Sequence, residues 1–490
     1  MTKPSTTKPG AHPLTPLFEP RGVIVAGASP HPGRFGTVVL HNLLRSKYQG
    51  RVFATSREGG DVLGVDTVRS VDELPDGAAD LVIVCTPIAA NGELLRACAR
   101  KGVRAAFVAS AGYSEAGAEG RQAEAELVAL AEETGIILAG PNGQGVVSTP
   151  VSLCAQIVAP YPPRGSIAVA SQSGNLTSSF MNYAIQTGAG ISRAISVGNG
   201  AVLSTVDYLE YFADDAETSV CLAYLEGVAD GGAFISRVRA VTQQKPLVLL
   251  KGGSSAGGQR AASSHTGSLA TNQRVFAAAC RQAGVARVET AEEGFYSAAT
   301  FATQPLPAGP NTVVITTAGG WGVLTADAIA GTDLRLLPLP DDLHASADAL
   351  LPARWSHNNP IDTAAGETRD TVPALLELAA QHESVDAVIF LGSGIQSNQA
   401  QMMKSGPYFP NYGLDRIVAF HERQDRRYAE AAASISATTG KPILVVTELA
   451  VTAPNNPGPR AVRESGRVAY PSAQIAVRAL DHLWRYARYR

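Results

Sequence analysis

The sequence predicts an α/β protein made of three consecutive domains, each built on a doubly wound parallel sheet. Its 490 residues exceed one ordinary domain, since domains of about 150 residues are common. Apolar runs of strand length alternate with segments of helix length, as in parallel sheets covered by helices. Two proline-rich stretches, APYPPRG and QPLPAGP, interrupt this alternation. The expected divisions are a disordered tail at 1–16 and domains at 17–158, 159–303 and 304–490.

The first domain opens with GVIVAGAS, an apolar run that ends in small residues and indicates a strand entering a tight loop. A helical segment, GTVVLHNLL, follows it. Further strands and helices then alternate in the order RVFATS, ADLVIVCTP, ANGELLRACARKG, VRAAFVASAG, AEGRQAEAELVALAEETG and GIILAGPNG. The pattern is typical of a doubly wound sheet.

The second and third domains repeat the design. The second begins with SIAVASQSGNLTSSF and continues with the strands SVCLAYLEG and KPLVLLKGG. The third begins with NTVVITTAGGWGVL and ends in a helix, SAQIAVRALDHLWRYARYR. Residues 398–416 are rich in Gly, Pro and Met, which predicts an inserted loop.

Composition excludes several classes of protein. The net charge of −3 offers no basic surface for nucleic acid. Five cysteines without a CxxC pair indicate neither a disulfide framework nor a zinc site, and the histidines form no HxxxH pattern, so no metal site is predicted. The N-terminus lacks a signal peptide, and no apolar run is long enough to span a bilayer. A cytoplasmic protein without nucleic-acid or membrane partners is expected.

Each domain opens with a strand that runs into a Gly/Ser loop at a helix start: AGASPHPG, ASQSGNL and TAGGWG. Helix N-termini bind anions because their backbone N–H groups are unpaired and the helix dipole favours negative charge. Ligands of open α/β sheets lie at the carboxyl ends of strands. Three such loops favour a protein that handles phosphates over one in which the loops are only turns.

Arg57 distinguishes the first loop from a common nicotinamide site. That site usually places an acidic residue after the second strand, where this chain has Thr55, Ser56 and Arg57. An arginine there indicates a phosphorylated ribose, as in NADP or coenzyme A, or a solvated side chain. The residues alone do not separate these alternatives.

His265 lies in AASSHTGSLA, a stretch of small residues that let a charged group approach the backbone closely. A covalent phosphohistidine, a general base and a structural histidine all fit this setting. Glu226 in AYLEG follows a strand directly, at the edge where ligands bind. Its carboxylate could accept a hydrogen bond from an imidazole and fix the tautomer, leaving the other nitrogen nucleophilic.

Taken together, the motifs resemble the alpha subunit of NDP-forming acyl-CoA synthetases, chiefly the ADP-forming acetate–CoA ligase type, and more distantly that of succinyl-CoA synthetase. The resemblance covers residues 17–490, and SHTGSLA is its most specific part. The matching stretches are FEPRGVIVAGAS, GPN, ASQSGNL, YLEG, KPLVLLKGG, AASSHTGSLA, TAGGWGVL, NPID and VAYPSAQIAVRAL. The resemblance implies a Rossmann-like CoA-binding domain followed by two flavodoxin-like ligase domains.

It also implies a mechanism. Phosphate attacks an acyl-CoA thioester to give an acyl phosphate and free CoA, and His265 then takes the phosphoryl group and carries it to a nucleotide site. Glu226 holds the histidine. The residues implied to bind CoA are Gly27, Ala28, Ser29, Gly36, Arg57, Thr86, Pro87 and Ser110. Those implied to bind phosphate are Ser173, Gly174, Asn175, Gly319 and Gly320.

No segment is left over for an ATP-grasp module, so the resemblance implies a separate ATP-grasp beta subunit that binds ATP or ADP with Mg²⁺, in a heterotetramer. The alternative is an acyl-CoA-binding regulatory module without ligase chemistry, which has no need of both His265 and Glu226. An NADP-linked oxidoreductase would rest on Arg57 alone. The chain departs from the family at Gly143, where Cys is usual, at the following Gln144, at Trp321, where Pro is usual, and in the loop ATSREGG, where Asn-Pro is commoner. Because these departures alter the walls of the pocket, the sequence does not identify the small carboxylate substrate. It does not distinguish ADP from GDP either, because the nucleotide is expected to bind the partner subunit.

Overall fold

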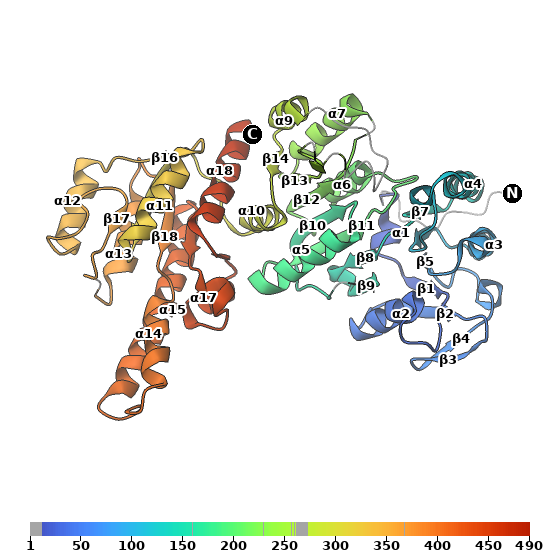
Figure 1. The fold of residues 1–490 in the computed structure, drawn as a ribbon, viewed down its shortest axis with the longest axis horizontal. Helices are drawn as coiled ribbons and strands as arrows, with labels where there is room; N and C mark the ends of the chain where they lie inside the picture. The colour runs from blue at the N-terminus through green and yellow to red at the C-terminus, as the bar shows by residue number, and fades with distance from the viewer. Residues whose placement is uncertain are drawn as a thin grey trace. The chain divides into compact units, whose positions relative to one another are not determined.

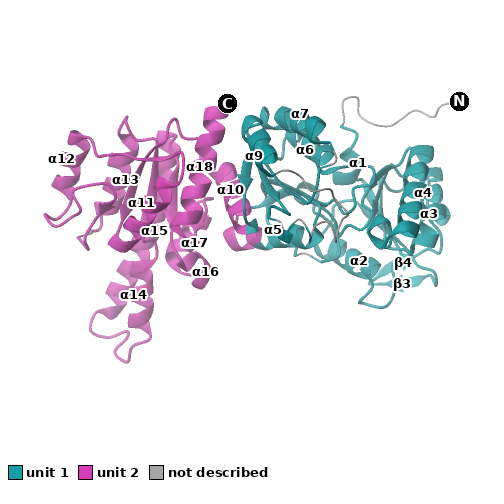
Figure 2. Ribbon diagram, turned by 45° about the horizontal axis from the view of Figure 1, so that its top comes forward, with its two compact units in different colours: residues 1–182, 190–291 teal, residues 183–189, 292–490 magenta. Residues whose placement is uncertain are grey.

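The computed structural model describes residues 12–158, 160–228, 230–255, 257–258, 260, 273–366 and 368–490. The chain forms two compact units, one of residues 1–182 and 190–291 and the other of residues 183–189 and 292–490 (Figure 2). In the described residues, two large sheets lie in the first unit and one lies in the second. The α/β class with mostly parallel sheets is therefore confirmed.

The first sheet is entirely parallel, in the order β2-β1-β5-β6-β7 (Figure 1). Its strands are β1 (Gly22–Ala26), β2 (Arg51–Thr55), β5 (Leu81–Val84), β6 (Ala105–Val108) and β7 (Ile137–Ala139). The connecting helices are α2 (Phe35–Arg45), α3 (Ile88–Arg100) and α4 (Ala118–Thr134), and β3 (Gly60–Val62) pairs with β4 (Val65–Thr67) in a hairpin. The strand order reverses between β1 and β5, which is where such sheets bind ligands.

The alternation of side chains explains why β1 is apolar throughout. Val23 and Val25 belong to the core cluster that includes residues of α2. Ile24 and Ala26 belong to the cluster that includes residues of α3 and α4. Because helices cover both faces, every residue of β1 is buried and the strand reads as a continuous apolar run.

The second sheet has the order β14-β13-β12-β10-β11-β8-β9. The parallel strands are β10 (Arg164–Ser171), β11 (Ile191–Ser196), β12 (Val220–Leu225), β13 (Leu247–Lys251) and β14 (Ala286–Val288). Its helices are α5 (Gly174–Thr187), α6 (Thr205–Asp214), α7 (Gly231–Thr242) and α9 (Gln273–Gln282). Two antiparallel strands, β8 (Gly145–Ser148) and β9 (Leu153–Gln156), extend this sheet although they precede the predicted boundary at 158.

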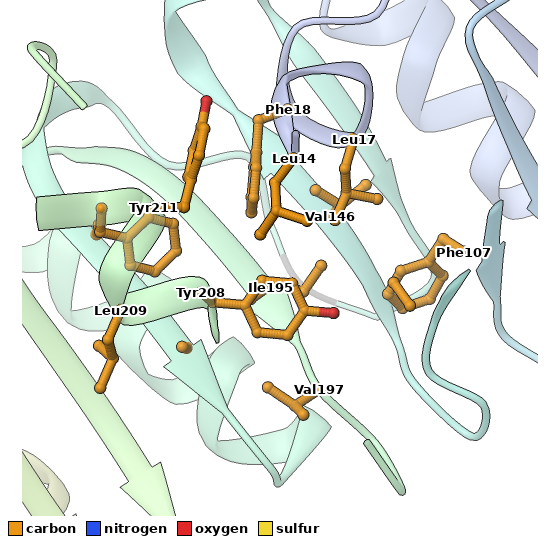
Figure 3. Close-up of a cluster of buried hydrophobic side chains, with 14 of the residues drawn as sticks. Leu14, Leu17, Phe18, Phe107, Val146, Ile195, Val197, Tyr208, Leu209 and Tyr211 are labelled. Carbon is orange, nitrogen blue, oxygen red and sulfur yellow. The ribbon is translucent and has the colours of Figure 1, made fainter. Parts of the chain in front are cut away.

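The first described residues of the chain, from His12 to Phe18, pack onto helix α6 of the second sheet. Leu14 is buried, and α1 (Thr15–Phe18) places the Phe18 ring 4.8 Å from that of Tyr211 in a stacked pair. Figure 3 shows these side chains in one core with Phe107, Val146 and Ile195, which come from both sheets. The expectation of a disordered tail at 1–16 is therefore wrong for residues 14–16, because Leu14 and Pro16 are buried and α1 begins at Thr15.

The third sheet is parallel, in the order β16-β15-β18-β19-β20, with β17 also paired to β15. Its strands are β15 (Asn311–Thr316), β16 (Arg335–Leu336), β17 (Ile361–Asp362), β18 (Ala387–Leu391), β19 (Ile443–Val446) and β20 (Ala469–Tyr470). The helices are α10 (Ala291–Thr303), α11 (Gly319–Ala330), α12 (Asp341–Leu350), α13 (Thr371–Gln381), α16 (Leu449–Thr452), α17 (Pro457–Glu464) and α18 (Ala473–Tyr489). The predicted second domain, 159–303, includes α10. In the structure the Thr300 hydroxyl of α10 instead forms a hydrogen bond of 2.7 Å with the Tyr470 hydroxyl of β20, so α10 belongs with the third sheet.

About half of the predicted loop at 398–416 is helical. It forms the end of α14 (Ile395–Lys404), a turn and the start of α15 (Leu414–Thr439), and the two helices make a hairpin that projects from the third sheet (Figure 1). Gly and Pro are confined to the turn at 405–413, so the helices on either side are uninterrupted. Within the described ranges, no helix has both the length and the apolar character needed to cross a membrane.

Candidate functional site

The loop after β1 is tied to the end of β2. Gly27 has φ +89°, which favours glycine, and its N–H and that of Ala28 donate to the Thr55 carbonyl at 3.2 and 2.9 Å. Gly36, in the first turn of α2, lies against the same loop: a Cβ there would be 2.3 Å from the Gly27 carbonyl oxygen. The structure thus brings Gly27, Ala28 and Gly36 together where β1 meets a helix N-terminus.

Thr86 and Ser110 lie side by side at the ends of β5 and β6. The Ser110 hydroxyl donates to the Thr86 carbonyl at 2.6 Å, and the Thr86 hydroxyl donates to Asn91 Oδ1 at 2.7 Å. A Cβ on Gly27 would be 3.2 Å from Thr86 Cγ2, so the three predicted residues share one sheet edge. Asn91 is a buried residue that sequence reasoning missed, and it braces this edge by also donating to the Tyr113 hydroxyl at 2.8 Å.

The remaining predicted CoA-binding residues border this edge. Pro87 is exposed and directly precedes α3. Ser29 accepts the His31 N–H at 3.2 Å. Arg57 is exposed beyond β2, and the ion pairs found in the described ranges do not include it, so its guanidinium is available to an anion.

The second predicted loop lies at the N-terminus of α5. Ser171 ends β10, and its hydroxyl accepts the Ser173 N–H at 3.2 Å and donates to the Ser173 carbonyl at 2.7 Å. Ser173 Oγ accepts the Leu176 N–H at 3.4 Å, as a helix cap does. Ser173, Gly174 and Asn175 therefore form a helix start of the kind that binds anions.

Gln144 covers this helix start. Its Nε2 donates to Asn175 Oδ1 at 3.1 Å, and a Cβ on Gly174 would be 2.3 Å from Gln144 Cδ. A side chain at the preceding Gly143 would be 2.6 Å from Phe107 Cζ and 2.7 Å from the Ser196 carbonyl oxygen. Gln144 thus adjoins the predicted phosphate site, where sequence reasoning assigned it no role, and Gly143 lies where a larger residue would meet Phe107 and Ser196.

Glu226 lies beside the second loop with a buried lysine. Its backbone N–H donates to Gln172 Oε1 at 2.5 Å. Lys251, the last residue of β13, donates its Nζ to the carbonyls of Glu226 and Gly252, each at 2.8 Å. Burial lowers the pKa of Lys251, while the charge of Glu226 opposes that shift. Burial, with the neighbouring Glu226 charge, raises the pKa of Tyr224 to about 12.

Adjacent strands explain this convergence: β10, β12 and β13 are neighbours, so Gln172, Glu226 and Lys251 meet at one carboxyl edge. Sequence reasoning missed Lys251. A lysine that ends an apolar strand and precedes two glycines is the signal that marks it.

His265 lies in 261–272, outside the described residues. The described chain on either side of it meets at the same edge of the second sheet. Gly253 follows β13, and its carbonyl accepts Gln273 Nε2 at 3.0 Å, where α9 begins. The pairing of His265 with Glu226 stays a prediction.

The third predicted loop differs from the other two. Gly319 and Gly320 begin α11 as expected, but a Cβ on Gly319 would be 2.5 Å from Asp362 Oδ2. A carboxylate thus already faces this helix start, which disfavours a phosphate there.

Trp321 follows the third loop and lies in the wall of a pocket of about 330 Å³. The walls combine apolar side chains with Glu448 and Ser472. The third departure from the family therefore shapes a cavity in this unit.

Comparisons with known proteins agree with this arrangement. Residues 21–149 match a CoA binding domain, residues 164–301 a succinyl-CoA ligase like flavodoxin domain and residues 312–394 a ligase-CoA domain. The chain is 32% identical over 481 residues to the acetate–CoA ligase [ADP-forming] I subunit alpha of Pyrococcus furiosus, covering 97% of this chain and 98% of the relative. It is 38% identical to subunit alpha of ligase II from the same organism, covering 76% of this chain and 81% of the relative.

A solved structure is similar to this chain over nearly its whole length. It is that of dinucleotide forming acetyl-coenzyme A synthetase 1 of Ca. Korarchaeum cryptofilum, in complex with phosphate and ADP. The identity is 29%, the TM-score is 0.82, and 97% of each chain is covered. The chain belongs to the family of ADP-forming acetate–CoA ligase alpha subunits.

Proposed function

We propose that this chain is the CoA-binding, phosphohistidine-bearing subunit of an ADP-forming acyl-CoA ligase, which converts a carboxylate, CoA and ATP into acyl-CoA, ADP and phosphate. The observation that carries the proposal is the full-length similarity to ligase alpha subunits, together with the meeting of Ser173, Gln144, Glu226 and Lys251 at one sheet edge. A module that only bound acyl-CoA would not need that second polar edge.

The first sheet edge suits CoA. The start of α2 can hold a pyrophosphate, because the first N–H groups of a helix are unpaired and the helix dipole attracts anions. The N–H groups of Gly27 and Ala28 are already bound by the Thr55 carbonyl, so these residues and Ser29 shape the loop that the ligand approaches. The exposed Arg57 beyond β2 is suited to the phosphate on the ribose of CoA. Thr86, Pro87 and Ser110 line the rest of the edge.

The second edge suits phosphoryl transfer. In the direction of ATP synthesis, a phosphate oxygen attacks the thioester carbonyl, the C–S bond breaks and CoA leaves as thiolate. An imidazole nitrogen of His265 then attacks phosphorus, the P–O bond to the acyl group breaks, and the carboxylate departs. The α5 N-terminus stabilises the oxygens of the transferring group, since such transfers need positioning and charge stabilisation more than covalent help. In this proposal the Glu226 carboxylate binds the other imidazole nitrogen.

The nucleotide step belongs to a partner in this proposal. Phosphohistidine passes its phosphoryl group to ADP, bound with Mg²⁺ on an ATP-grasp beta subunit, and the two kinds of subunit form a heterotetramer. The naming of both Pyrococcus relatives as subunit alpha supports a separate partner.

The test is labelling of His265. The purified chain is incubated with the ATP-grasp subunit of the same source and γ-labelled ATP, and the label is assayed for stability in base and lability in acid. The expected result is one acid-labile label that His265→Ala abolishes and that a carboxylate with CoA discharges. CoA binding without any label would contradict the ligase and favour the acyl-CoA-binding regulatory module.

A further inference from the structure

Two histidines and an aspartate meet in the second unit, where α12 ends and the following loop leads to β17. His344 and Asp348 are one turn apart on α12, and His357 lies in the loop. One ligand atom from each lies within 4.8 Å of the others. The sequence predicted no metal site because no HxxxH pattern is present; here the fold itself supplies the second histidine.

The distances match those between ligands of one metal ion. His344 Nδ1 lies 3.2 Å from Asp348 Oδ2, and His357 Nδ1 lies 3.1 Å from Asp348 Oδ1. A tetrahedral zinc ion with bonds of about 2.0–2.1 Å holds neighbouring ligand atoms about 3.3 Å apart. Each imidazole therefore already presents Nδ1 to one oxygen of the Asp348 carboxylate at nearly the separation of two ligand atoms on one ion.

The contacts of His357 direct its Nδ1 at the carboxylate of Asp348. Its Nε2 lies 3.0 Å from the Ala353 carbonyl, which only accepts, so Nε2 carries a proton. In the neutral ring Nδ1 then has only a lone pair, and it faces a carboxylate oxygen. Two acceptors at 3.1 Å repel each other unless a proton or a metal ion lies between them. A backbone carbonyl bonded to the distal nitrogen is the usual support of a metal-binding histidine.

Trp355 supports the same carboxylate. Its indole Nε1 donates to Asp348 Oδ1 at 2.7 Å, and its buried ring lies 4.8 and 5.2 Å from the rings of His357 and His344. His357 itself has φ +54°, a left-handed conformation that is uncommon outside glycine. The loop thus holds this ring in place at a conformational cost.

We propose that His344, Asp348 and His357 bind one divalent transition-metal ion of the zinc class, with water as the fourth ligand. Imidazole nitrogen is a preferred ligand of zinc, cobalt, nickel and copper, whereas magnesium and calcium prefer sites made of oxygen atoms. The three side chains are 33%, 44% and 48% exposed, which leaves a path for the ion and room for water. The ion links the loop at 351–360 to α12, and the site is independent of the ligase chemistry.

Zinc binding to the full-length, tag-free chain tests the proposal. The probe is Zn²⁺ alone, titrated in competition with a chromophoric chelator, and Co²⁺ is used to record the visible absorption of a tetrahedral nitrogen and oxygen site. The variants are His344→Ala, His357→Ala and their double mutant. His41→Ala, which removes an exposed histidine of the first unit, is the matched control.

One ion per chain is expected for the wild type and for His41→Ala. Loss of a supporting group alone weakens metal binding by about 10–100-fold, so loss of a ligand is expected to weaken it by at least about 100-fold. Trp355 provides a second readout: zinc is expected to change the indole fluorescence, and Trp355→Phe to abolish that change. Equal zinc uptake by wild type and the double mutant would overturn the proposal, as would no uptake by any of them, in which case a proton occupies the site.

Discussion

Replacing Gly36 by alanine tests whether the close approach of α2 to the loop after β1 builds the CoA site. The new Cβ would be 2.3 Å from the Gly27 carbonyl oxygen and 2.9 Å from the Ala28 nitrogen, both backbone atoms. An ordinary carbon–oxygen contact is about 3.4 Å, so helix and loop must separate by about 1 Å. A displacement of that size at a positioned site reduces function by about 100-fold.

Two opposing effects set the stability of Gly36→Ala. Alanine favours a helix over glycine by at most about 1 kcal/mol. Overpacking against backbone destabilises by about 1–3 kcal/mol. The clash is therefore expected to prevail, and the free energy of unfolding to fall.

Gly33→Ala is the matched control, because it lies in the same loop and a Cβ there has no neighbour within 4 Å. Isothermal titration with CoA and urea denaturation measure the two effects. We expect CoA affinity to fall by about 100-fold in Gly36→Ala and to be unchanged in Gly33→Ala. Wild-type affinity in Gly36→Ala, or an equal loss in both variants, would refute the reasoning.

Three further perturbations follow from other contacts. Arg57→Ala is expected to lower CoA affinity by about tenfold and to leave the affinity for 3′-dephospho-CoA unchanged. Equal losses of affinity for both ligands in isothermal titration would exclude a contact between Arg57 and the 3′-phosphate. Gln144→Ala removes the side chain over Gly174, so KM for phosphate should rise while KM for CoA stays constant in steady-state assays; an unchanged KM for phosphate would place that ion elsewhere. Arg193 is fully buried and bonds Asp215 at 3.1 Å, so Arg193→Met should destabilise the first unit by about 3–5 kcal/mol in urea denaturation, and no change would contradict the ion pair. Although burial opposes it, the bonding to Arg193 holds the pKa of Asp215 below its usual value of about 3.9. That stability is therefore present above about pH 4 and is lost as the pH falls through the folded pKa, so acid should destabilise the wild type more than Arg193→Met.

The local sequence pattern was enough to predict the long apolar strands and the loops that follow them, but not the short or edge strands such as β8, β9 and β14. Strands such as β1 and β5 are buried on both faces, so their residues are all apolar whatever the neighbours, and the run can be recognised in isolation. The loops at Gly27 and Ser173 follow because a parallel strand that passes into a helix needs small and capping residues at that point. Similarity of motifs then supplied the CoA and phosphohistidine chemistry.

Pairing between distant segments needed the tertiary structure. The segments GVVS and LCAQ do not indicate that β8 and β9 join the second sheet, because the residues of an edge strand do not depend on which strand it pairs with. The placement of Gln144 over Gly174, 30 positions later in the chain, depends on that pairing. The helical hairpin of α14 and α15 was missed because the glycines and prolines of its turn dominate the local composition.

The sequence by itself determined the α/β class, the long apolar strands such as β1, β5 and β12, the helix starts that face their carboxyl edges and the family chemistry, because each depends on residues that are close along the chain. Only the tertiary structure decided which polar side chains share an edge. Lys251 with Glu226, and His357 with the His344–Asp348 pair, are 25 and 9 or more residues apart. Their contacts arise from strand order and from the path of a loop, and spacing along the chain encodes neither.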